Sequence, residues 1–283
     1  MTSALAEQEV MVAKIRERYR DGRLIPFIGA GFSLPLGLPL WDELVAVAAK
    51  ELGFEPELFE LHGDNPELLG YYELRKKEGV KELVDWMNKS FHSTKADKKR
   101  VASIQHKSLA GLTEIRTVYT TNYEHHIERA FEDMKRPTVV RSTLGDFSAP
   151  VPEGAVEVLK FHGDLETAAA GGHRLVLTEG DYFDRFALES PFDQRLRADL
   201  LGNSFLFMGY RFSDRNTRYI WHRMHRMAKD YGEQLEHRSY YVAFELGEVQ
   251  RALLEQWGID AVVLEPRNHS QQISDFLEKL GGP

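Results

Sequence analysis

The spacing of apolar residues divides the chain into regions of different structure. An opening helix is expected from about Ala4 to Tyr19, and the apolar run Leu24 to Ile28 stops at Gly29-Ala30-Gly31, as a strand entering a turn would. From Leu40 to about Leu112, apolar residues recur at spacings of three and four, which predicts several consecutive helices. We interpret this stretch, about residues 41–113, as a helical insertion or cap.

Beyond the insertion, short apolar runs alternate with amphipathic stretches. Further strands are predicted at Arg116 to Thr121, Thr138 to Arg141, Val156 to Phe161, Arg174 to Leu177, Ser204 to Met208, Arg238 to Phe244 and Asp260 to Leu264. Helices are predicted at about Tyr123 to Met134, Phe192 to Leu201, Asp214 to Tyr231, Glu245 to Trp257 and Gln271 to Leu280. This alternation is typical of βαβ units, so we expect an α/β, Rossmann-like fold with a mostly parallel sheet and helices on both faces. No repeat or linker marks a boundary, and residues 1–283 are expected to form a single domain.

Composition narrows the classes of function. The chain has 283 residues, 42% of them apolar, and 36 Lys+Arg against 44 Asp+Glu give a net charge of −8. The absence of cysteine excludes disulfides, thiol nucleophiles and zinc sites built on thiolates. No apolar run is long enough for a membrane span, and the acidic N-terminal stretch does not resemble a secretory signal, so a cytoplasmic protein is expected. The acidic balance argues against a broad nucleic-acid surface, although Lys95 to Arg100 (KADKKR) is a local exception, most simply a solvated helix start or loop.

Four predicted strands are followed by small, polar or titratable residues. These segments are Gly29-Ala30-Gly31-Phe32-Ser33, Thr120-Thr121-Asn122-Tyr123, His162-Gly163-Asp164 and Gly209-Tyr210-Arg211-Phe212-Ser213-Asp214. In open α/β sheets, ligands bind outside the carboxyl ends of the strands. We therefore expect the four segments to meet at one edge of the sheet.

Each segment also allows a structural interpretation. Gly-Ala-Gly would let backbone N–H groups approach a pyrophosphate, but Leu34 stands where a dinucleotide fingerprint has its third glycine, so the turn could be only a tight turn. Asn122 could orient a water or a ribose hydroxyl, or it could cap the next helix. His162 could transfer protons near neutral pH, or it could be structural. No Gly-x-Ser-x-Gly or His-Glu-x-x-His motif occurs, and no metal site is expected.

Taken together and in this order, the segments resemble the sirtuin family. The resemblance rests on Gly29 to Ser33, Gly37-Leu38-Pro39-Leu40-Trp41, Thr120 to Glu124, Lys160 to Asp164 and Phe205 to Asp214. It extends over nearly the whole chain and is greatest toward the bacterial sirtuin-like NAD-degrading effectors of anti-phage defence, such as the NADase domain of Thoeris systems.

The resemblance implies an NAD+ pocket between the sheet and the helical insertion. The cofactor-binding residues it implies are Gly29, Ala30, Gly31, Phe32, Ser33, Thr121, Asn122, His162, Gly209, Ser213 and Asp214. Ala30, Gly31 and Ser33 would line the phosphate and ribose site, and Gly209 and Ser213 would meet the adenosine half. Asn122 and His162 would be catalytic: Asn122 would position the attacking water and the nicotinamide ribose, and His162 would act as general base. Two residues depart from the family pattern, Glu124 in place of the usual Asp and Arg215 in place of a Pro.

The lack of cysteine also discriminates within the family. Sirtuin-like protein deacylases normally carry a four-cysteine zinc module, which this chain cannot form. The resemblance then implies an NAD+ glycohydrolase that uses NAD as substrate, needs no metal, and releases nicotinamide and ADP-ribose. The main alternative is a non-catalytic module that binds NAD+ or ADP-ribose and signals through assembly. A protein deacylase, or a DNA-associated effector using Lys95 to Arg100, is a weaker alternative.

An enzyme that destroys NAD+ would harm its own cell, so the defence reading implies that its activity is gated. The chain is expected to end soon after the last predicted strand and helix, which leaves no room for a sensor domain. We therefore expect a homo-oligomer that works with a separately encoded defence partner, such as a helicase-type ATPase or an Argonaute-like protein. No membrane partner is expected.

Overall fold

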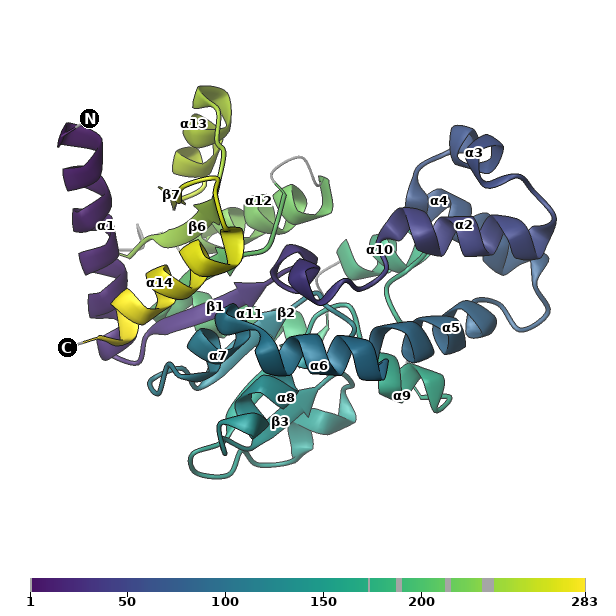
Figure 1. The fold of residues 1–283 in the computed structure, drawn as a ribbon, viewed down its shortest axis with the longest axis horizontal. Helices are drawn as coiled ribbons and strands as arrows, with labels where there is room; N and C mark the ends of the chain where they lie inside the picture. Colours follow the sequence, from purple (N-terminus) through teal and green to yellow (C-terminus); the bar gives the residue numbers. More distant parts are fainter. Residues whose placement is uncertain (1, 173, 187–189, 212–214, 231–236, 283) are drawn as a thin grey trace.

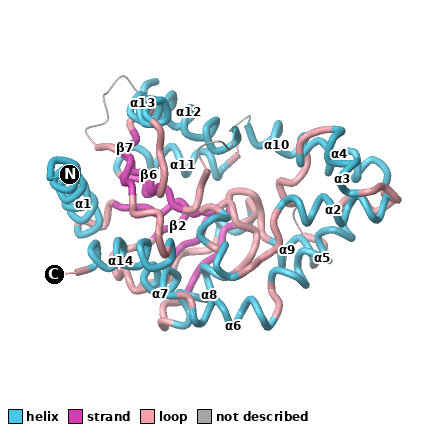
Figure 2. The backbone as a smooth tube through the Cα atoms, turned by 45° about the horizontal axis from the view of Figure 1, so that its top comes forward, coloured by secondary structure: helices cyan, strands magenta, loops and turns pink. Residues whose placement is uncertain are grey.

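A parallel sheet forms the centre of the molecule (Figures 1 and 2). The computed structural model describes residues 2–172, 174–186, 190–211, 215–230 and 237–282. Within them the strands are β1 (Leu24–Ile28), β2 (Thr117–Thr120), β3 (Thr138–Arg141), β4 (Val156–Lys160), β5 (Ser204–Met208), β6 (Ser239–Ala243) and β7 (Ile259–Val263). Their order is β3-β4-β2-β1-β5-β6-β7, and every pairing is parallel. The predicted α/β class is confirmed.

Strand order reverses at β1. Strand β2 pairs with one edge of β1. Strand β5, which comes later in the chain, pairs with the opposite edge of β1. Strands β1, β4 and β5 are buried along their whole length, as expected for a sheet covered on both faces. The loops after β1, β2 and β5 therefore meet at a topological switch point, where open α/β folds bind ligands.

Helices cover both faces of the sheet. One face carries α1 (Thr2–Arg20), α7 (Ile104–Ala110), α8 (His126–Asp133) and α14 (His269–Gly281). The other carries α11 (Pro191–Gly202), α12 (Arg215–Asp230) and α13 (Glu248–Gln256). Each layer buries its own core, around Phe131 and Leu277 on the first face and around Leu196 and Trp221 on the second. None of the described helices combines the length and hydrophobicity needed to cross a bilayer.

A helical lobe lies beside the carboxyl edge of the sheet (Figure 1). It consists of α2 (Trp41–Leu52), α3 (Pro56–Phe59), α4 (Asn65–Arg75) and α5 (Lys81–Phe91). Its core also includes Tyr123, from the loop after β2, and Leu165, the first residue of the helix that follows the loop after β4. The remaining helical segments are η1 (Ala30–Phe32), η2 (Leu34–Leu36), η3 (Glu60–His62), α6 (Thr94–Ala102), η4 (Gly145–Ser148), α9 (Leu165–Ala169) and α10 (Glu179–Phe186). Because the lobe shares its core with the two loops, it is fixed to the edge where they end.

The segment Arg174 to Leu177 is not a strand, contrary to the prediction. Its backbone is irregular, although the N–H of Val176 donates to the carbonyl of His162 at 2.9 Å. Leu175 and Leu177 are buried in the core of the helical lobe. The alternating apolar residues that indicated a strand therefore reflect packing against the lobe rather than membership of the sheet.

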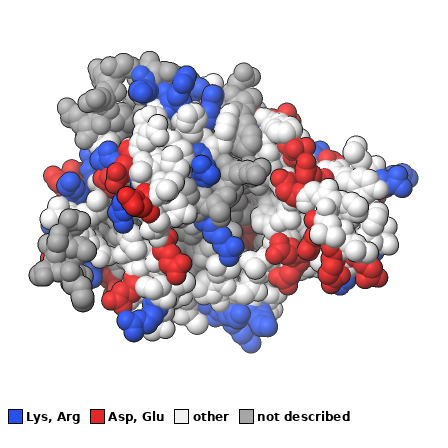
Figure 3. All heavy atoms as spheres, turned by 90° about the horizontal axis from the view of Figure 1, so that it is seen from above, with Lys and Arg blue, Asp and Glu red and all other residues white. Residues whose placement is uncertain are grey.

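The basic segment Lys95 to Arg100 lies on α6. Its three lysines are exposed, which confirms the interpretation as a solvated stretch. Arg100 is buried and forms ion pairs with Asp97 and Asp133, so its charge is already balanced. Acidic side chains gather on the surface of the helical lobe (Figure 3), in keeping with the negative net charge.

Backbone contacts at the switch point explain why glycines occur there. The N–H of Gly31 donates to the carbonyl of Gly209 at 2.8 Å, and a Cβ on Gly31 would lie 2.7 Å from that oxygen. Gly209 has φ +77°, and a Cβ there would lie 2.3 Å from the nitrogen of Phe32. The loops after β1 and β5 can approach this closely only because neither carries a side chain at the contact.

The contact between these two loops predicts that two glycine-to-alanine substitutions, both at positive φ, will lower the free energy of unfolding by different amounts. Gly258→Ala meets open space at φ +75° and should lower the free energy of unfolding by about 1–2 kcal/mol. Gly209→Ala adds a backbone clash and should cost about 4 kcal/mol or more. Urea denaturation of both variants measures the difference, and equal losses would show that the two loops are not in contact.

Candidate functional site

In the bend after β1, Gly29 to Ser33, most backbone N–H groups donate hydrogen bonds within the fold. The N–H groups of Gly29, Gly31, Phe32 and Ser33 all donate to carbonyls of the bend or of the segment from Met208 to Gly209. Ala30 is exposed, and its N–H makes no hydrogen bond within the described part of the chain. Of the several N–H groups expected to face a pyrophosphate, only that of Ala30 is left without a partner among the described residues of the bend.

Asn122 joins the loops after β1 and β2. Its Nδ2 donates to Oγ of Ser33 at 3.3 Å and to Oε1 of Glu124 at 3.0 Å. The hydroxyl of Ser33 donates to the same carboxylate oxygen at 2.6 Å, and all three side chains are buried. The alternative interpretation of Asn122 as a helix cap is wrong, because α8 begins at His126 and its N-cap is His125.

Two acceptors in this cluster have no hydrogen-bond partner among the described residues. Oδ1 of Asn122 and Oε2 of Glu124 are buried and accept no hydrogen bond from any described residue. Buried acceptors in proteins are almost always paired with protein or with ordered water. The cluster therefore offers two fixed acceptors to the hydroxyl or amide groups of a ligand, or to a water held beside one.

His162 lies one strand away from Asn122. Thr120 of β2 pairs with Lys160 of β4, and the N–H of Phe161 donates to the carbonyl of Thr120 at 2.7 Å. Asn122 and His162 each come two residues after this pair, on neighbouring strands. No hydrogen bond joins the side chains of Asn122 and His162 in the part of the molecule that is described. The imidazole packs edge to face against Tyr182 of α10, with ring centroids 5.5 Å apart.

Burial sets the protonation state of His162. Loss of solvation, assisted by the positive charge of Arg185, lowers the pKa of His162 to about 3. The imidazole is therefore neutral at physiological pH, with a ring nitrogen able to accept a proton.

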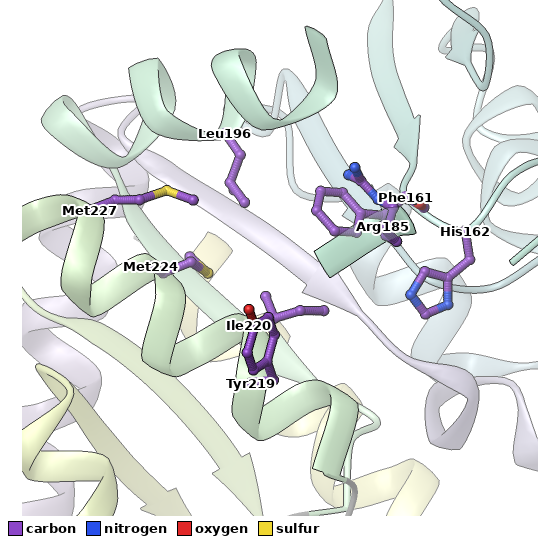
Figure 4. Close-up of a pocket in the computed structure, with 8 residues that line it drawn as sticks. All are labelled: Phe161, His162, Arg185, Leu196, Tyr219, Ile220, Met224 and Met227. Atoms are coloured by element: carbon purple, nitrogen blue, oxygen red, sulfur yellow. Dashed lines mark hydrogen bonds between the residues drawn. The ribbon is translucent and has the colours of Figure 1, made fainter. Parts of the chain in front are cut away.

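Arg185 of α10 is a site residue that sequence reasoning missed. Its guanidinium lies 3.6 Å from the centroid of the Phe161 ring, and its Nε donates to the carbonyl of Phe161 at 3.1 Å. An ion pair of 2.8 Å with buried Asp193 balances its charge. Figure 4 shows Arg185 and His162 at one end of a small cavity, whose remaining lining residues are Phe161, Leu196, Tyr219, Ile220, Met224 and Met227. No sequence motif marked Arg185, because it comes from a helix outside the four strand-end segments.

Lys160 is a second residue whose role was not foreseen. Its fully buried ammonium lies 3.0 Å from Oδ2 of Asp164 and 3.1 Å from Oε1 of Glu128. It also donates to the carbonyls of Tyr123 and Glu124, at 2.9 and 2.7 Å. One cation thus holds the loop that carries Asn122 against the loop that carries His162. A lysine ending an otherwise mainly apolar strand was the signal that could have identified it.

The Lys160 ammonium also contacts two of three side chains that could together hold a metal ion. Ligand atoms of His125, Glu128 and Asp164 lie within 4.8 Å of one another, close enough to hold an ion. Lys160 contacts both carboxylates, so its single positive charge already offsets part of their negative charge and stands beside the position that an ion would take. The neighbouring His126 bonds instead to the carbonyl of Phe91, at 2.8 Å.

The other predicted residues lie around the bend. The hydroxyl of Thr121 is 3.1 Å from that of Tyr210, which donates to the carbonyl of Ile28. Gly209 contacts the bend through its backbone. Ser213 and Asp214 lie outside the described residues.

Comparison with known proteins identifies the family. A family model described as a SIR2-like domain matches residues 116–262, just over half of the chain. The chain belongs to the SIR2-like family. This confirms the resemblance drawn from the strand-end motifs, although the match begins after the Gly29 to Ser33 bend.

Curated relatives of this SIR2-like chain carry informative names. NAD(+) hydrolase ThsA of Bacillus cereus (strain MSX-D12) is 30% identical over 217 residues, which are 76% of this chain and 43% of that protein. NAD(+) hydrolase ThsA of Enterococcus faecium is 28% identical over 218 residues, 76% of this chain and 42% of that protein. Defense-associated sirtuin 2 of Bacillus subtilis is 26% identical over 278 residues, 95% of this chain and 26% of that protein. The SIR2-like chain therefore matches less than half the length of each of these relatives.

The buried charges around Lys160 predict a severe loss of stability when the cation is removed. Lys160→Met leaves the buried carboxylate of Glu128 without its cation and leaves Asp164 with only its hydrogen bonds to His125 and to the N–H of Thr167, and it should cost about 3–5 kcal/mol in the free energy of unfolding. Adding Glu128→Gln removes one of these charges and should restore part of the loss. Chemical denaturation of the single and double variants tests this, and a stability equal to that of the parent chain would contradict the ion network.

The buried histidines predict sensitivity to mild acid. Burial lowers the pKa of His106, like that of His162, to about 3, whereas the unfolded chain binds these protons near pH 6.5. The unfolded state then binds more protons between these values, so stability is lost as pH falls below about 6.5. The slope from the two groups should approach about 3 kcal/mol per pH unit.

Urea denaturation between pH 7 and 5 measures this slope. Carboxylates with lowered pKa values, such as that of Asp164, contribute mainly below this range. His92 has its pKa lowered to about 3 as well and adds a similar share, so His162→Gln should reduce the measured slope by about 1.4 kcal/mol per pH unit, the share of one group. An unchanged slope would mean that His162 is not buried in its neutral form.

Proposed function

We propose that this SIR2-like chain is an NAD+ glycohydrolase that cleaves the bond between nicotinamide and ribose. The observation that carries the proposal is the Ser33–Asn122–Glu124 cluster, where a buried amide is held by two partners while its Oδ1 has no partner among the described residues. A fixed acceptor at the switch point of an α/β sheet suits a ribose hydroxyl or an attacking water.

The proposed reaction breaks the C1′–N bond of NAD+, and the bonding electron pair leaves with neutral nicotinamide. The oxygen of water forms a new bond to C1′, and one proton is released, which gives ADP-ribose. Because the pyridinium is already a cationic leaving group, no acid is required to expel it. The protein has only to hold the ribose, exclude bulk water and admit one nucleophile.

His162 is proposed as the base that takes the proton from this water. Its lowered pKa makes it a weak base, but it is neutral and ready to accept at physiological pH. A weak base suffices in this scheme because a water bonding to a cationic, oxocarbenium-like carbon becomes strongly acidic. Arg185 and Lys160 are positioning residues, which fix the segments around His162 and Asn122.

The remaining roles follow from the bend. The exposed N–H of Ala30 is proposed to meet the pyrophosphate, with Gly31 and Ser33 beside the phosphate and ribose. Gly209 and Ser213 are proposed to face the adenosine half. Glu124, which departs from the family pattern, is proposed to orient Asn122 through their 3.0 Å hydrogen bond.

The names of the relatives support the same activity and a setting in defence. ThsA is named as an NAD(+) hydrolase, and a longer relative is named as a defence-associated sirtuin. We propose that this chain likewise acts in anti-phage defence. Gating of the activity, a homo-oligomer and a separately encoded partner stay predictions from the family resemblance.

Incubation with NAD+ at high protein concentration tests the proposal. The parent chain should release nicotinamide and ADP-ribose, and Asn122→Ala or His162→Ala should lower the rate at least about 100-fold. His222→Ala provides a matched control, because His222 is an exposed histidine of α12, and it should keep the parent rate. Chromatography of the products and thermal unfolding of each variant give the two readouts.

The result also separates the enzyme from a binding module. If NAD+ binds by calorimetry but the parent chain releases no nicotinamide at any concentration, the non-catalytic alternative is correct. Full turnover in both Asn122→Ala and His162→Ala would refute the proposed roles of these residues.

A further inference from the structure

The imidazole of His162 is buried without a hydrogen bond to fix its orientation. No hydrogen bond joins either of its ring nitrogens to another of the described residues. A ring nitrogen is hydrogen bonded, by contrast, in each of four other histidines, which are His92, His106, His125 and His126. A histidine that exchanges protons usually has its ring oriented through the nitrogen that does not react. In His162 this task falls to packing.

Two tyrosine rings pack against this imidazole. Tyr182 meets it edge to face, with ring centroids 5.5 Å apart and an interplanar angle of 87°. The ring of Tyr123 lies further away, at 6.4 Å, and its hydroxyl donates to the carbonyl of Val176 at 2.6 Å. Edge-to-face pairs at this separation are favoured because the positive edge of one ring meets the negative face of the other. The Tyr182 ring therefore restricts rotation of the His162 side chain.

Packing in the hydrophobic cores does not account for Tyr182. The residue is buried, yet it belongs to none of the three cores that the described residues form, on the two faces of the sheet and in the helical lobe. Its ring lies instead against His162, at the carboxyl edge of the sheet. The burial of Tyr182 thus serves the contact with the proposed base.

The same face of α10 also holds the peptide bond that precedes His162. Arg185 follows Tyr182 by three residues, so the two side chains lie on one face of the helix. The guanidinium of Arg185 lies over the Phe161 ring beside His162 (Figure 4), and its Nε donates to the carbonyl of Phe161 at 3.1 Å. Helix α10 therefore contacts both the ring of His162 and the backbone next to it.

Polar contacts at the start of α10 hold the helix in place. The carboxylate of Asp181 accepts hydrogen bonds from the N–H and the hydroxyl of Thr178, both at 2.8 Å. It also pairs with Arg174, whose guanidinium forms a second ion pair, of 2.6 Å, with Glu73 of α4. Tyr182 is therefore carried by a helix that is tied to the helical lobe.

We propose that Tyr182 is a positioning residue for NAD+ hydrolysis: its ring holds the His162 imidazole so that a ring nitrogen faces the attacking water. The role rests on the proposed function, in which His162 takes a proton from that water. Tyr182 acts through His162 and takes no part in the chemistry. Because a misplacement of about 1 Å can cost about 100-fold in rate, loss of the ring should lower kcat rather than weaken substrate binding.

Steady-state kinetics of nicotinamide release test this role. Tyr182→Leu removes the ring and should lower kcat about tenfold or more, while KM stays within about twofold of the parent value. Tyr182→Phe keeps the ring and should hold kcat within about twofold of the parent chain. If Tyr182→Leu does not fold, Tyr182→Met replaces it, because methionine fills irregular space without a ring.

A matched control separates positioning from loss of stability. Tyr240 of β6 is also buried, but it lies in the core around Phe131 and Leu277. Tyr240→Leu should lower the unfolding temperature and keep the parent kcat. Thermal unfolding of every variant verifies that the rates are measured on folded protein.

NMR of the His162 imidazole supplies a readout that does not depend on hydrolysis. The imidazole proton signals, assigned by their loss in His162→Gln, should move in Tyr182→Leu, because the ring current of the neighbouring tyrosine is removed. They should stay near their parent positions in Tyr182→Phe and Tyr240→Leu. Unchanged signals in Tyr182→Leu would show that the tyrosine ring does not orient His162, and the proposal would be wrong.

The kinetic outcomes are equally decisive. A parent-like kcat in Tyr182→Leu overturns the positioning role, and a raised KM with unchanged kcat overturns it as well, since Tyr182 would then contact the substrate. A parent chain that releases no nicotinamide contradicts the proposed function and, with it, the role of Tyr182 in that reaction. Shifted imidazole signals in Tyr182→Leu would in that case still support the ring contact, so the two failures are distinguishable.

Discussion

A single buried ammonium fixes the geometry on which the candidate site depends. Lys160 reaches two backbone carbonyls of the loop after β2 and the carboxylate of Asp164 in the loop after β4. Its desolvation is unfavourable by itself, and the contacts with Glu128 and Asp164, together with the two carbonyls and the nearby charge of Glu124, offset that cost. The two loops are therefore linked through one charge, and the relative position of Asn122 and His162 follows from it.

A second constraint acts at the neighbouring pair of strands. The backbones of the loops after β1 and β5 touch at Gly31 and Gly209, so the bend cannot move away from β5 without breaking this contact. Ser33 then reaches across to Asn122 and Glu124. Contacts of two different kinds, one of charge and one of close backbone packing, thus bring three loops to one point.

The sequence predicted the sheet well because both faces are covered. Strands buried on both sides, such as β1, β4 and β5, appear as short apolar runs, and seven predicted runs lie close to the observed strand bounds, including those of the partly buried β3 and β7. The same pattern was misleading at Arg174 to Leu177, where alternating apolar residues pack on the helical lobe. Apolar spacing reports burial, and it does not report which layer buries a side chain.

The site was only partly predictable for a related reason. Asn122, Ser33 and His162 were found because they follow strands, where ligands are expected. Lys160 and Arg185 act through contacts with segments distant in sequence, which no local motif encodes. The partner of Asn122 illustrates the point: Glu124 departs from the family pattern, yet its extra methylene still places Oε1 within reach of both Asn122 and Ser33. In this chain the loop after β2 therefore supplies a buried carboxylate oxygen that both Asn122 and Ser33 reach, which a local motif does not reveal.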